Sequence, residues 1–336
     1  MKLALVGDFM LGHEFSTRRP PFSKAFQILS KADITFANLE NPLGTKGHPR
    51  EKMFTFRSKP SLVKIVANSG IDVVSIANNH MLDYGEEALL ETMQILSKTE
   101  TPFVGAGRNL AEAERPVVLE RKGIRVAFLG LAATLPLGAA ASPDRSGLAP
   151  VHVTTSYEVD PTLTQEQPGN PPKIRTQVDL RDEERICRNI RSAREVADHV
   201  VVGIHWGVAF TKDRAEYQQP LGRKMIEAGA SIVVGHHSHV RQGLERYTHG
   251  IILYSLGDFV FHDRVDMDGE SGMIATAKLS KKGIRRITLW PITVEVKTGL
   301  PILGKMKEAL QLLGEMRQLS VHGDFELEGN SVNVNL

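Results

Sequence analysis

The feature that most constrains this chain is a cluster of histidines directly after an apolar run. The run Ala230–Val234 reads Ala-Ser-Ile-Val-Val, and the motif Gly235–His239 that follows it reads Gly-His-His-Ser-His. In an extended segment alternate side chains point to the same side, so His237 and His239 can reach one common point. This is a spacing typical of metal ligands. Taken alone, the motif is also compatible with a histidine-rich surface loop.

Similar apolar runs recur along the chain, and each ends in small or chemically capable residues. Segments with helical periodicity lie between the runs, among them Glu86–Ser97 and Glu183–Ala197, and strands that alternate with helices predict an α/β sheet. The polar residues at the predicted strand ends are Asp8, Glu40, Asn79, His205, His237 and His239. Because ligands of open α/β sheets bind beyond the carboxyl ends of the strands, we expect these side chains to converge.

Each of these residues also has a structural interpretation. Asp8 could cap a helix, Asn79 could be a turn residue, and His205 could be a buried core histidine. Their shared position at strand ends nevertheless favours one common site. Imidazoles, an amide carbonyl and carboxylates form the ligand set that two adjacent divalent cations require. Such a metal pair suits the hydrolysis of a phosphoester.

Composition limits the other possibilities. The chain has 336 residues, of which 41% are hydrophobic, so it can bury a large core in one domain or two. Its net charge is +2 and no long block of one sign occurs, which gives no support to a nucleic-acid partner. The single cysteine, Cys187, excludes an internal disulfide framework. The N-terminal apolar run is too short for a secretory signal and no segment approaches a membrane span, so we expect a cytoplasmic protein.

The motifs, in their order along the chain, resemble those of the calcineurin-like metallophosphoesterases. They are Gly7-Asp8, Asn38-Leu39-Glu40, Asn79-His80, His205 and His237-Ser238-His239. Longer strings are similar to the CapA/PgsA-type branch, which is linked to capsule and poly-γ-glutamate biosynthesis. Among them are Ala77-Asn78-Asn79-His80, His205-Trp206-Gly207 and Tyr254-Ser255-Leu256-Gly257. The resemblance covers roughly residues 1 to 262 and implies an α/β sandwich of mixed sheets flanked by helices.

The resemblance also implies that six residues hold one or two divalent metal ions, with Mn, Fe or Zn as the candidates. They are Asp8 and His239 for a first ion, Asn79, His205 and His237 for a second ion, and Glu40 as the bridge between the two. The wider superfamily carries Asp-x-His in the first motif, whereas this chain has Asp8-Phe9-Met10. One ligand of the first ion is therefore missing, with His13 as a conceivable substitute, and a mononuclear site is an alternative. The branch also generally shows Asn where this chain has Asp258.

Two further residues are expected to act in catalysis. His80 matches the family histidine that contacts the scissile phosphate and protonates the leaving group. Asp83 is placed to orient that imidazole, or alternatively to cap the helix that begins near Glu86.

Three residues are candidates for contacts with the substrate. Arg57 could grip a carboxylate or phosphate, Trp206 could form an apolar wall, and Arg241 could line the cleft. Each of them also has an ordinary structural interpretation.

The segment from Pro136 to Val178 is rich in proline, and we expect it to be an insertion over or beside the cleft. After residue 262, the ranges Gly272–Leu279 and Ile284–Val296 predict a hairpin, and Lys305–Leu319 predicts an amphipathic helix. We expect the tail from Val321 to fray. Residues 1–262 then form the core, and residues 263–336 complete the same domain.

Three functions are compatible with the sequence. The leading one is a metal-dependent hydrolase of a phosphoester, linked by resemblance to capsule and poly-γ-glutamate biosynthesis. The second is a metal-dependent enzyme that acts on a peptide or γ-glutamyl amide by hydrolysis, transfer or epimerisation. The third is a non-catalytic partner of a polymer-synthesis complex. The expected substrate is a small molecule, a peptide or a polymer, and the sequence makes no prediction of oligomeric state.

Overall fold

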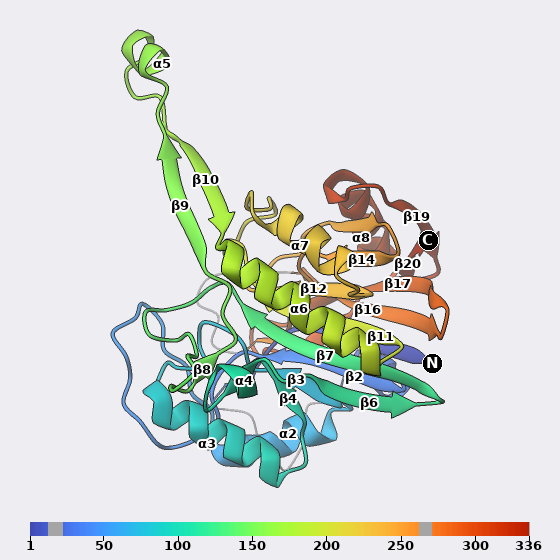
Figure 1. Cartoon of the computed structure of the whole chain (residues 1–336). Helices are drawn as coiled ribbons and strands as arrows, with labels where there is room; N and C mark the ends of the chain where they lie inside the picture. Colours follow the sequence, from blue (N-terminus) through green and yellow to red (C-terminus); the bar gives the residue numbers. More distant parts are fainter. Residues whose placement is uncertain (13–22, 262–270, 336) are drawn as a thin grey trace.

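Two β-sheets packed face to face form the centre of the molecule (Figure 1). The structure is a computed structural model that describes residues 1–12, 23–261 and 271–335. In this part of the chain the larger sheet has ten strands, and β15 (Asp258–Phe261) pairs with β1 while β18 (Pro301–Leu303) pairs with β17. Its main path is β19 (Asp324–Glu328), β20 (Ser331–Asn335), β17 (Gly283–Val294), β16 (Ser271–Ser280), β1 (Lys2–Met10), β2 (Ile34–Leu39), β3 (Val73–Ser75) and β4 (Phe103–Val104).

The smaller sheet has six strands in the described residues. Its order is β13 (Leu244–Tyr247), β14 (Gly250–Leu253), β12 (Ile232–His236), β11 (His199–His205), β7 (Ile124–Ala132) and β6 (Val117–Arg121). In the larger sheet β1 to β4 run parallel, and β16, β17, β20 and β19 continue it with antiparallel pairing. In the smaller sheet β14, β12, β11 and β7 run parallel, and the two edge strands β13 and β6 are antiparallel. The expected α/β fold with mixed sheets is confirmed. Because parallel neighbours end on the same side, the polar residues after β1, β2, β3, β11 and β12 meet at one edge of the sandwich.

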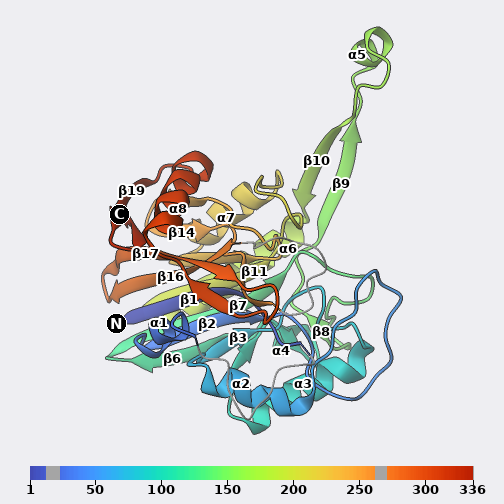
Figure 2. The same cartoon turned by 180° about the vertical axis from the view of Figure 1, so that it is seen from behind.

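Helices cover the outer faces of both sheets (Figure 2). The larger sheet carries α1 (Phe26–Ser30), η1 (Pro60–Leu62), α2 (Val63–Asn68) and α3 (Gly85–Lys98). The smaller sheet carries α4 (Leu110–Ala113), α6 (Leu180–Val196) and α7 (Gln218–Glu227). A further helix, α8 (Met306–Leu319), adds Leu312 and Met316 to the core between the sheets. The three predicted helices are confirmed as α3, α6 and α8, and Cys187 is buried on α6. No helix of the described residues has the length and apolarity that a bilayer crossing needs.

The proline-rich segment, which was expected over or beside the cleft, contains a long hairpin. Residues Val153–Glu158 and Lys173–Val178 form an antiparallel hairpin, β9 and β10, and α5 (Pro161–Glu166) lies near its tip. In both views this hairpin projects from the body as an arm (Figures 1 and 2). The preceding part of the segment contains β8 (Gly147–Leu148), which pairs with β5 (Ala106–Gly107). The β-branched and aromatic residues of β9 and β10 explain why this part of the segment forms a hairpin.

The C-terminal segment is more ordered than expected. The predicted hairpin of residues 272–296 is confirmed as β16 and β17. The tail beyond Val321 was expected to fray, which is wrong, because β19 and β20 pair with each other and β20 pairs with β17. Val332 and Val334 are buried between the sheets, and this burial outweighs the usual fraying of a terminus. The expected boundary between residues 262 and 263 lies outside the described residues.

The two sheets depend on aromatic packing at their contact. Phe36 of β2 and Phe128 of β7 are fully buried and stack with ring centroids 5.6 Å apart. We predict that Phe36→Ala lowers the free energy of unfolding by about 3–5 kcal/mol, because the substitution removes a buried aromatic ring from the core and leaves a cavity in its place. Chemical denaturation checks this value. Phe54→Ala, at a side chain that is 55% exposed, is the control and should cost about 1 kcal/mol or less. Equal losses in both variants would contradict the assignment of Phe36 to the core.

Candidate metal centre

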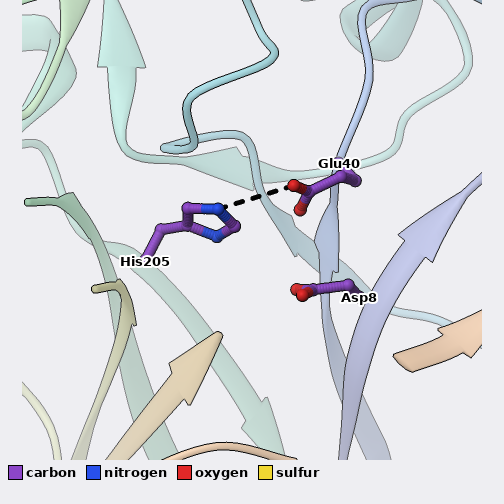
Figure 3. Close-up of side chains that lie close together, drawn as sticks. All are labelled: Asp8, Glu40 and His205. Atoms are coloured by element: carbon purple, nitrogen blue, oxygen red, sulfur yellow. Dashed lines mark ion pairs between the residues drawn. The ribbon is translucent and has the colours of Figure 1, made fainter. Parts of the chain in front are cut away.

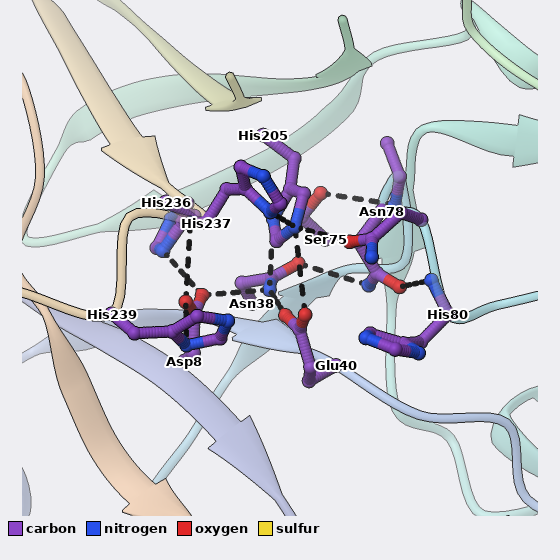
Figure 4. Close-up of polar contacts among 12 residues, drawn as sticks. Asp8, Asn38, Glu40, Ser75, Asn78, His80, His205, His236, His237 and His239 are labelled. Carbon is purple, nitrogen blue, oxygen red and sulfur yellow. Dashed lines mark hydrogen bonds and ion pairs between the residues drawn. The ribbon is translucent and has the colours of Figure 1, made fainter. Parts of the chain in front are cut away.

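The structure brings the expected metal ligands together at the carboxyl edge of the sandwich (Figure 4). Asp8 lies on β1, Glu40 follows β2, His205 ends β11, and the histidine motif begins at the end of β12. Parallel pairing fixes this convergence, since Asp8 is in register with Asn38 on β2. The residues therefore come from both sheets and from segments far apart in the sequence.

Asp8, Glu40 and His205 form a first group of potential ligands (Figure 3). One ligand atom from each lies within 4.8 Å of the others, and all three side chains are buried. His205 Nε2 is 3.5 Å from Glu40 Oε1. Glu40 Oε1 is buried and has no hydrogen-bond partner, whereas the amide of Asn38 donates to Glu40 Oε2. A buried acceptor without a donor is costly unless a cation or a solvent molecule satisfies it.

A second group consists of Asp8, His239 and Asp258, again with one atom of each within 4.8 Å of the others. His239 Nδ1 lies 2.9 Å from Asp258 Oδ1 and 3.6 Å from Asp8 Oδ2. Asp8 belongs to both groups, so the two groups are adjacent. Asp258 was not among the expected ligands. It follows the run Ile251–Ser255 after two further residues, and this position near a strand end is the signal by which it could have been found.

The other two expected ligands lie next to His205. Asn79 Oδ1 is 2.8 Å and His237 Nδ1 is 3.1 Å from His205 Nε2. The backbone N–H of His237 donates to Asp8 Oδ2 at 3.1 Å. His237 and His239 both have positive φ, 91° and 57°. Such values are uncommon for residues other than glycine, and strain of this kind is concentrated at functional sites.

Burial and mutual repulsion control the charges in the centre. Burial lowers the pKa of His237 to about 3, and the positive charge of His239 adds to this effect. Burial and then His237 also lower the pKa of His205 well below its usual value. Both imidazoles are therefore neutral near pH 7, which is the form that binds metals.

The carboxylates are affected in opposite directions. Burial, together with the charges of Asp8 and Asp258, raises the pKa of Glu40 well above its usual value. Burial also acts to raise the pKa of Asp8, but its contact with His236 and the neighbouring histidines outweigh burial and lower that pKa. A bound cation would favour the ionised form of Glu40, so these residues fit a divalent ion.

His80 and Asp83 form a hydrogen-bonded pair beside this centre (Figure 4 shows His80 next to Glu40). His80 Nδ1 lies 2.7 Å from Asp83 Oδ2, and Asp83 also accepts from the backbone N–H of Phe56 at 2.8 Å. The residue before α3 is Tyr84, whose side chain makes no capping hydrogen bond. Asp83 is therefore bonded to the His80 ring, and the alternative that its side chain caps the helix is wrong.

Lys52 was missed by the sequence analysis. Its ammonium group forms an ion pair with Asp83 and donates to the carbonyl oxygen of Asn79 at 2.7 Å. Lys52 thus contacts both Asp83, the partner of His80, and the backbone of Asn79, an expected metal ligand. Sequence offered no signal for it, because Lys52 lies 31 residues from Asp83 in a segment without a motif.

Two of the expected substrate contacts are contradicted by burial. Trp206 is completely buried, where its indole N–H donates to the carbonyl oxygen of Tyr254 and its ring stacks on the Tyr254 ring. Arg241 is also buried and forms an ion pair with Glu315 of α8 at 2.7 Å. Neither side chain offers a surface to a substrate. Both were placed in the cleft because they are close in sequence to metal ligands, and sequence proximity does not show on which side of a strand end a residue packs.

Arg57 remains only a predicted substrate contact. Its guanidinium lies 3.9 Å from the centroid of the Tyr84 ring and donates to the carbonyl oxygens of Thr45 and Lys46. The substitute ligand His13 lies outside the described residues.

A protein family accounts for most of the chain. The family described as "Bacterial capsule synthesis protein PGA_cap" matches residues 2–263. The chain belongs to the PGA_cap family. This confirms the resemblance to the CapA-type branch, and the matched range contains all of the residues of the centre described above.

Two relatives are 29% identical to this chain and align with 90% of its length. One is "Capsule biosynthesis protein CapA" of Bacillus anthracis, 69% of which is covered, and the other is "PGA biosynthesis protein CapA" of Bacillus subtilis strain 168, 74% of which is covered. A third, "Probable polyglutamine synthesis accessory protein" of Mycobacterium tuberculosis, is 27% identical over 72% of the chain and 60% of its own length. A crystal structure of a hypothetical protein from Thermus thermophilus shares the fold, with a TM-score of 0.50, 16% identity, and coverage of 87% of this chain and 99% of that chain.

The neutral burial of His237 predicts a pH effect on the metal-free protein. Below about pH 6.5 this histidine is protonated in the unfolded chain but stays neutral in the folded chain. The free energy of unfolding therefore falls as the pH decreases. We expect a slope of about 1 kcal/mol per pH unit from His237 near pH 5.5. Chemical denaturation after chelation, compared with the His237→Gln variant, isolates this slope from the opposite contribution of Glu40. Parallel pH curves for the two proteins would contradict the prediction.

Proposed function

We propose that this protein is a metal-dependent hydrolase of the metallophosphoesterase type that cleaves a phosphoester. The observation that carries the proposal is the convergence of buried carboxylates and neutral imidazoles beside a histidine that is oriented by a carboxylate. Mixed nitrogen and oxygen donors suit Mn, Fe or Zn. Buried charged groups of this kind contribute little to stability, and apolar residues in their place would serve the fold at least as well. The cluster is therefore better explained by function than by stability.

Six residues would hold the metal ions in this proposal. They are Asp8, Glu40, Asn79, His205, His237 and His239. When bound, divalent ions supply Lewis-acid stabilisation of the phosphoryl oxygens and activate water for attack. The left-handed backbone of His237 and His239 presents their rings to the centre, and burial keeps the ring of His237 neutral and ready to bind.

His80 acts as the general acid. Its Nδ1–H donates to Asp83, which directs the opposite nitrogen, Nε2, away from the carboxylate. Protonated Nε2 then gives its proton to the leaving-group oxygen. Burial lowers the pKa of His80, and the hydrogen bond to Asp83 acts in the opposite direction and stabilises the imidazolium. Lys52 and the backbone N–H of Phe56 keep the Asp83 carboxylate in place.

We further propose that the reaction serves the synthesis of a capsule or of poly-γ-glutamate. The family description and the names of the two Bacillus relatives support this role. The substrate is then a small phosphoester, a peptide or a polymer intermediate. An amide is the second candidate for the bond that is cleaved, because a glutamate polymer is joined by amides and the same metal chemistry polarises an amide carbonyl. The name "accessory protein" of the mycobacterial relative favours a third role, as a non-catalytic partner.

Catalysis should require His80, whereas metal binding should not depend on it. We predict that His80→Ala lowers kcat on 4-nitrophenyl phosphate at least about 100-fold, the usual contribution of general acid catalysis. The Mn content of the His80→Ala variant, measured by elemental analysis, should stay at the wild-type value. His249→Ala, at an exposed histidine, is the control and should change neither quantity. Turnover of a γ-glutamyl peptide alone would replace the phosphoesterase proposal, and metal binding without turnover of either substrate would favour the partner role.

Asp83 should act through His80. We predict that Asp83→Asn lowers kcat about 10- to 100-fold with little change in KM, because the imidazolium loses a charged partner and its orientation. The basic limb of the pH profile of kcat should move to lower pH, since the carboxylate raises the pKa of His80. Asp160→Asn, in the cap of α5 on the arm, is the matched control. A pH profile identical to that of the wild type would show that Asp83 only maintains the fold.

A further inference from the structure

We propose that Asp258 is a metal ligand, which completes the site for the first ion in place of the ligand absent from the first motif. In the same proposal Asp8 is the carboxylate shared by both ions. This inference rests on the metal dependence proposed above and goes beyond it. It assigns a role to a residue outside the expected ligand set, and it gives the bridging position to Asp8 instead of Glu40.

Strand pairing places Asp258 beside Asp8. β15 pairs in parallel with β1, and the two aspartates are partners in register. The backbone N–H of Asp8 donates to the carbonyl oxygen of Gly257 at 3.0 Å. The two strands approach so closely that a Cβ on Gly7 would lie 1.8 Å from that oxygen. Asp258 is therefore held at the same edge as Asp8 by backbone contacts, and not by a flexible loop.

The distances around His239 fit a shared ion. Two ligands of one ion can lie no farther apart than twice the metal–ligand bond, or about 4.2 Å for bonds to nitrogen and oxygen near 2.1 Å. His239 Nδ1 is 2.9 Å from Asp258 Oδ1 and 3.6 Å from Asp8 Oδ2. One imidazole and two carboxylates in this arrangement form a three-ligand site that leaves positions open for water or substrate.

Met10 does not supply the ligand that the superfamily motif has at this position. Its side chain is completely buried in a small apolar cluster with Phe261 and Val294, against which Phe56 packs. The site therefore gains a carboxylate from β15 where it lacks an imidazole from β1. This exchange keeps the number of ligands and adds one negative charge, which offsets the charge of a divalent ion.

An independent observation points to a ligand in the adjacent group. Glu40 Oε1 is buried, lacks a hydrogen-bond partner and faces His205 across 3.5 Å. Within the described residues, the ion pairs of Asp8 and Glu40 involve histidines only, with no lysine or arginine. Buried carboxylates so close together repel one another unless a cation offsets their charge.

Asp8 is the residue common to both groups. Its Oδ2 faces His239 at 3.6 Å and accepts from the backbone N–H of His237, while its Oδ1 accepts from the amide of Asn38 at 2.9 Å. Glu40 belongs to the group with His205 but not to the group with His239. The geometry thus assigns the shared carboxylate to β1.

The experiment measures how many metal ions bind and whether they are magnetically coupled, and it does not depend on an activity assay. The full-length protein is stripped with a chelator and titrated with Mn²⁺, and bound Mn is measured by calorimetry, elemental analysis and electron paramagnetic resonance. We expect two ions per wild-type chain with an exchange-coupled signal. Asp258→Ala should bind one ion with the six-line signal of isolated Mn²⁺, and His205→Ala should also lose one ion.

Asp258→Asn keeps the shape of the side chain and guards against a folding defect in the alanine variant. It should bind the weaker ion at least about 10-fold less tightly, as loss of ligand charge weakens the site. Asp144→Asn, at an exposed carboxylate that accepts a hydrogen bond from Ser142, is the matched control and should bind as the wild type does. Thermal unfolding compares the folded fraction of all variants.

Each other outcome overturns the inference. If Asp258→Ala or Asp258→Asn keeps two coupled ions with wild-type affinity, Asp258 is a structural partner of His239 and nothing more. A wild-type protein that binds a single ion would exclude the first site while leaving the metal-dependent hydrolase intact. A wild-type protein that binds no Mn, Fe or Zn would remove both this inference and the proposed function.

Discussion

The burial of several carboxylates at one edge of a β-sandwich is the constraint on which the rest of this structure depends. Asp8, Glu40 and Asp258 are almost completely shielded from water, and removing charged groups from water is expensive. Contacts with the amide of Asn38 and with the surrounding imidazoles reduce this cost. The larger sheet holds the carboxylates in place, because β1 pairs in parallel with β15 on one side and with β2 on the other. The fold thus maintains a local repulsion that a metal ion would relieve.

The ladder geometry also explains how much of the site could be predicted from the sequence. Buried parallel strands appear as continuous apolar runs, and the residue that follows each run must lie at a common edge, so Asp8, Glu40, His205 and the histidine motif could be grouped without coordinates. The helices were equally accessible, because an apolar face with a period near 3.6 persists over several turns in α3, α6 and α8.

What the sequence did not reveal depends on contacts between distant segments. Lys52 joins Asp83 across 31 residues, and Arg241 joins Glu315 across 74, so no local pattern distinguishes the first as part of the site and the second as part of the scaffold. Trp206 resembled a cleft wall until its partner Tyr254 was known. The C-terminal strands were judged by the usual behaviour of termini, although Val332 and Val334 alternate with polar residues in the pattern of a strand with one buried face.

The positive φ angles of His237 and His239 have a consequence for the evolution of this loop. Residues branched at Cβ are strongly disfavoured in the left-handed region, whereas histidine, asparagine and aspartate tolerate it. Drift at these two positions is therefore confined by the main chain as well as by ligand chemistry. The side chains that satisfy both demands carry nitrogen or oxygen donors, so a change of residue here would tend to retune metal preference before it abolished binding.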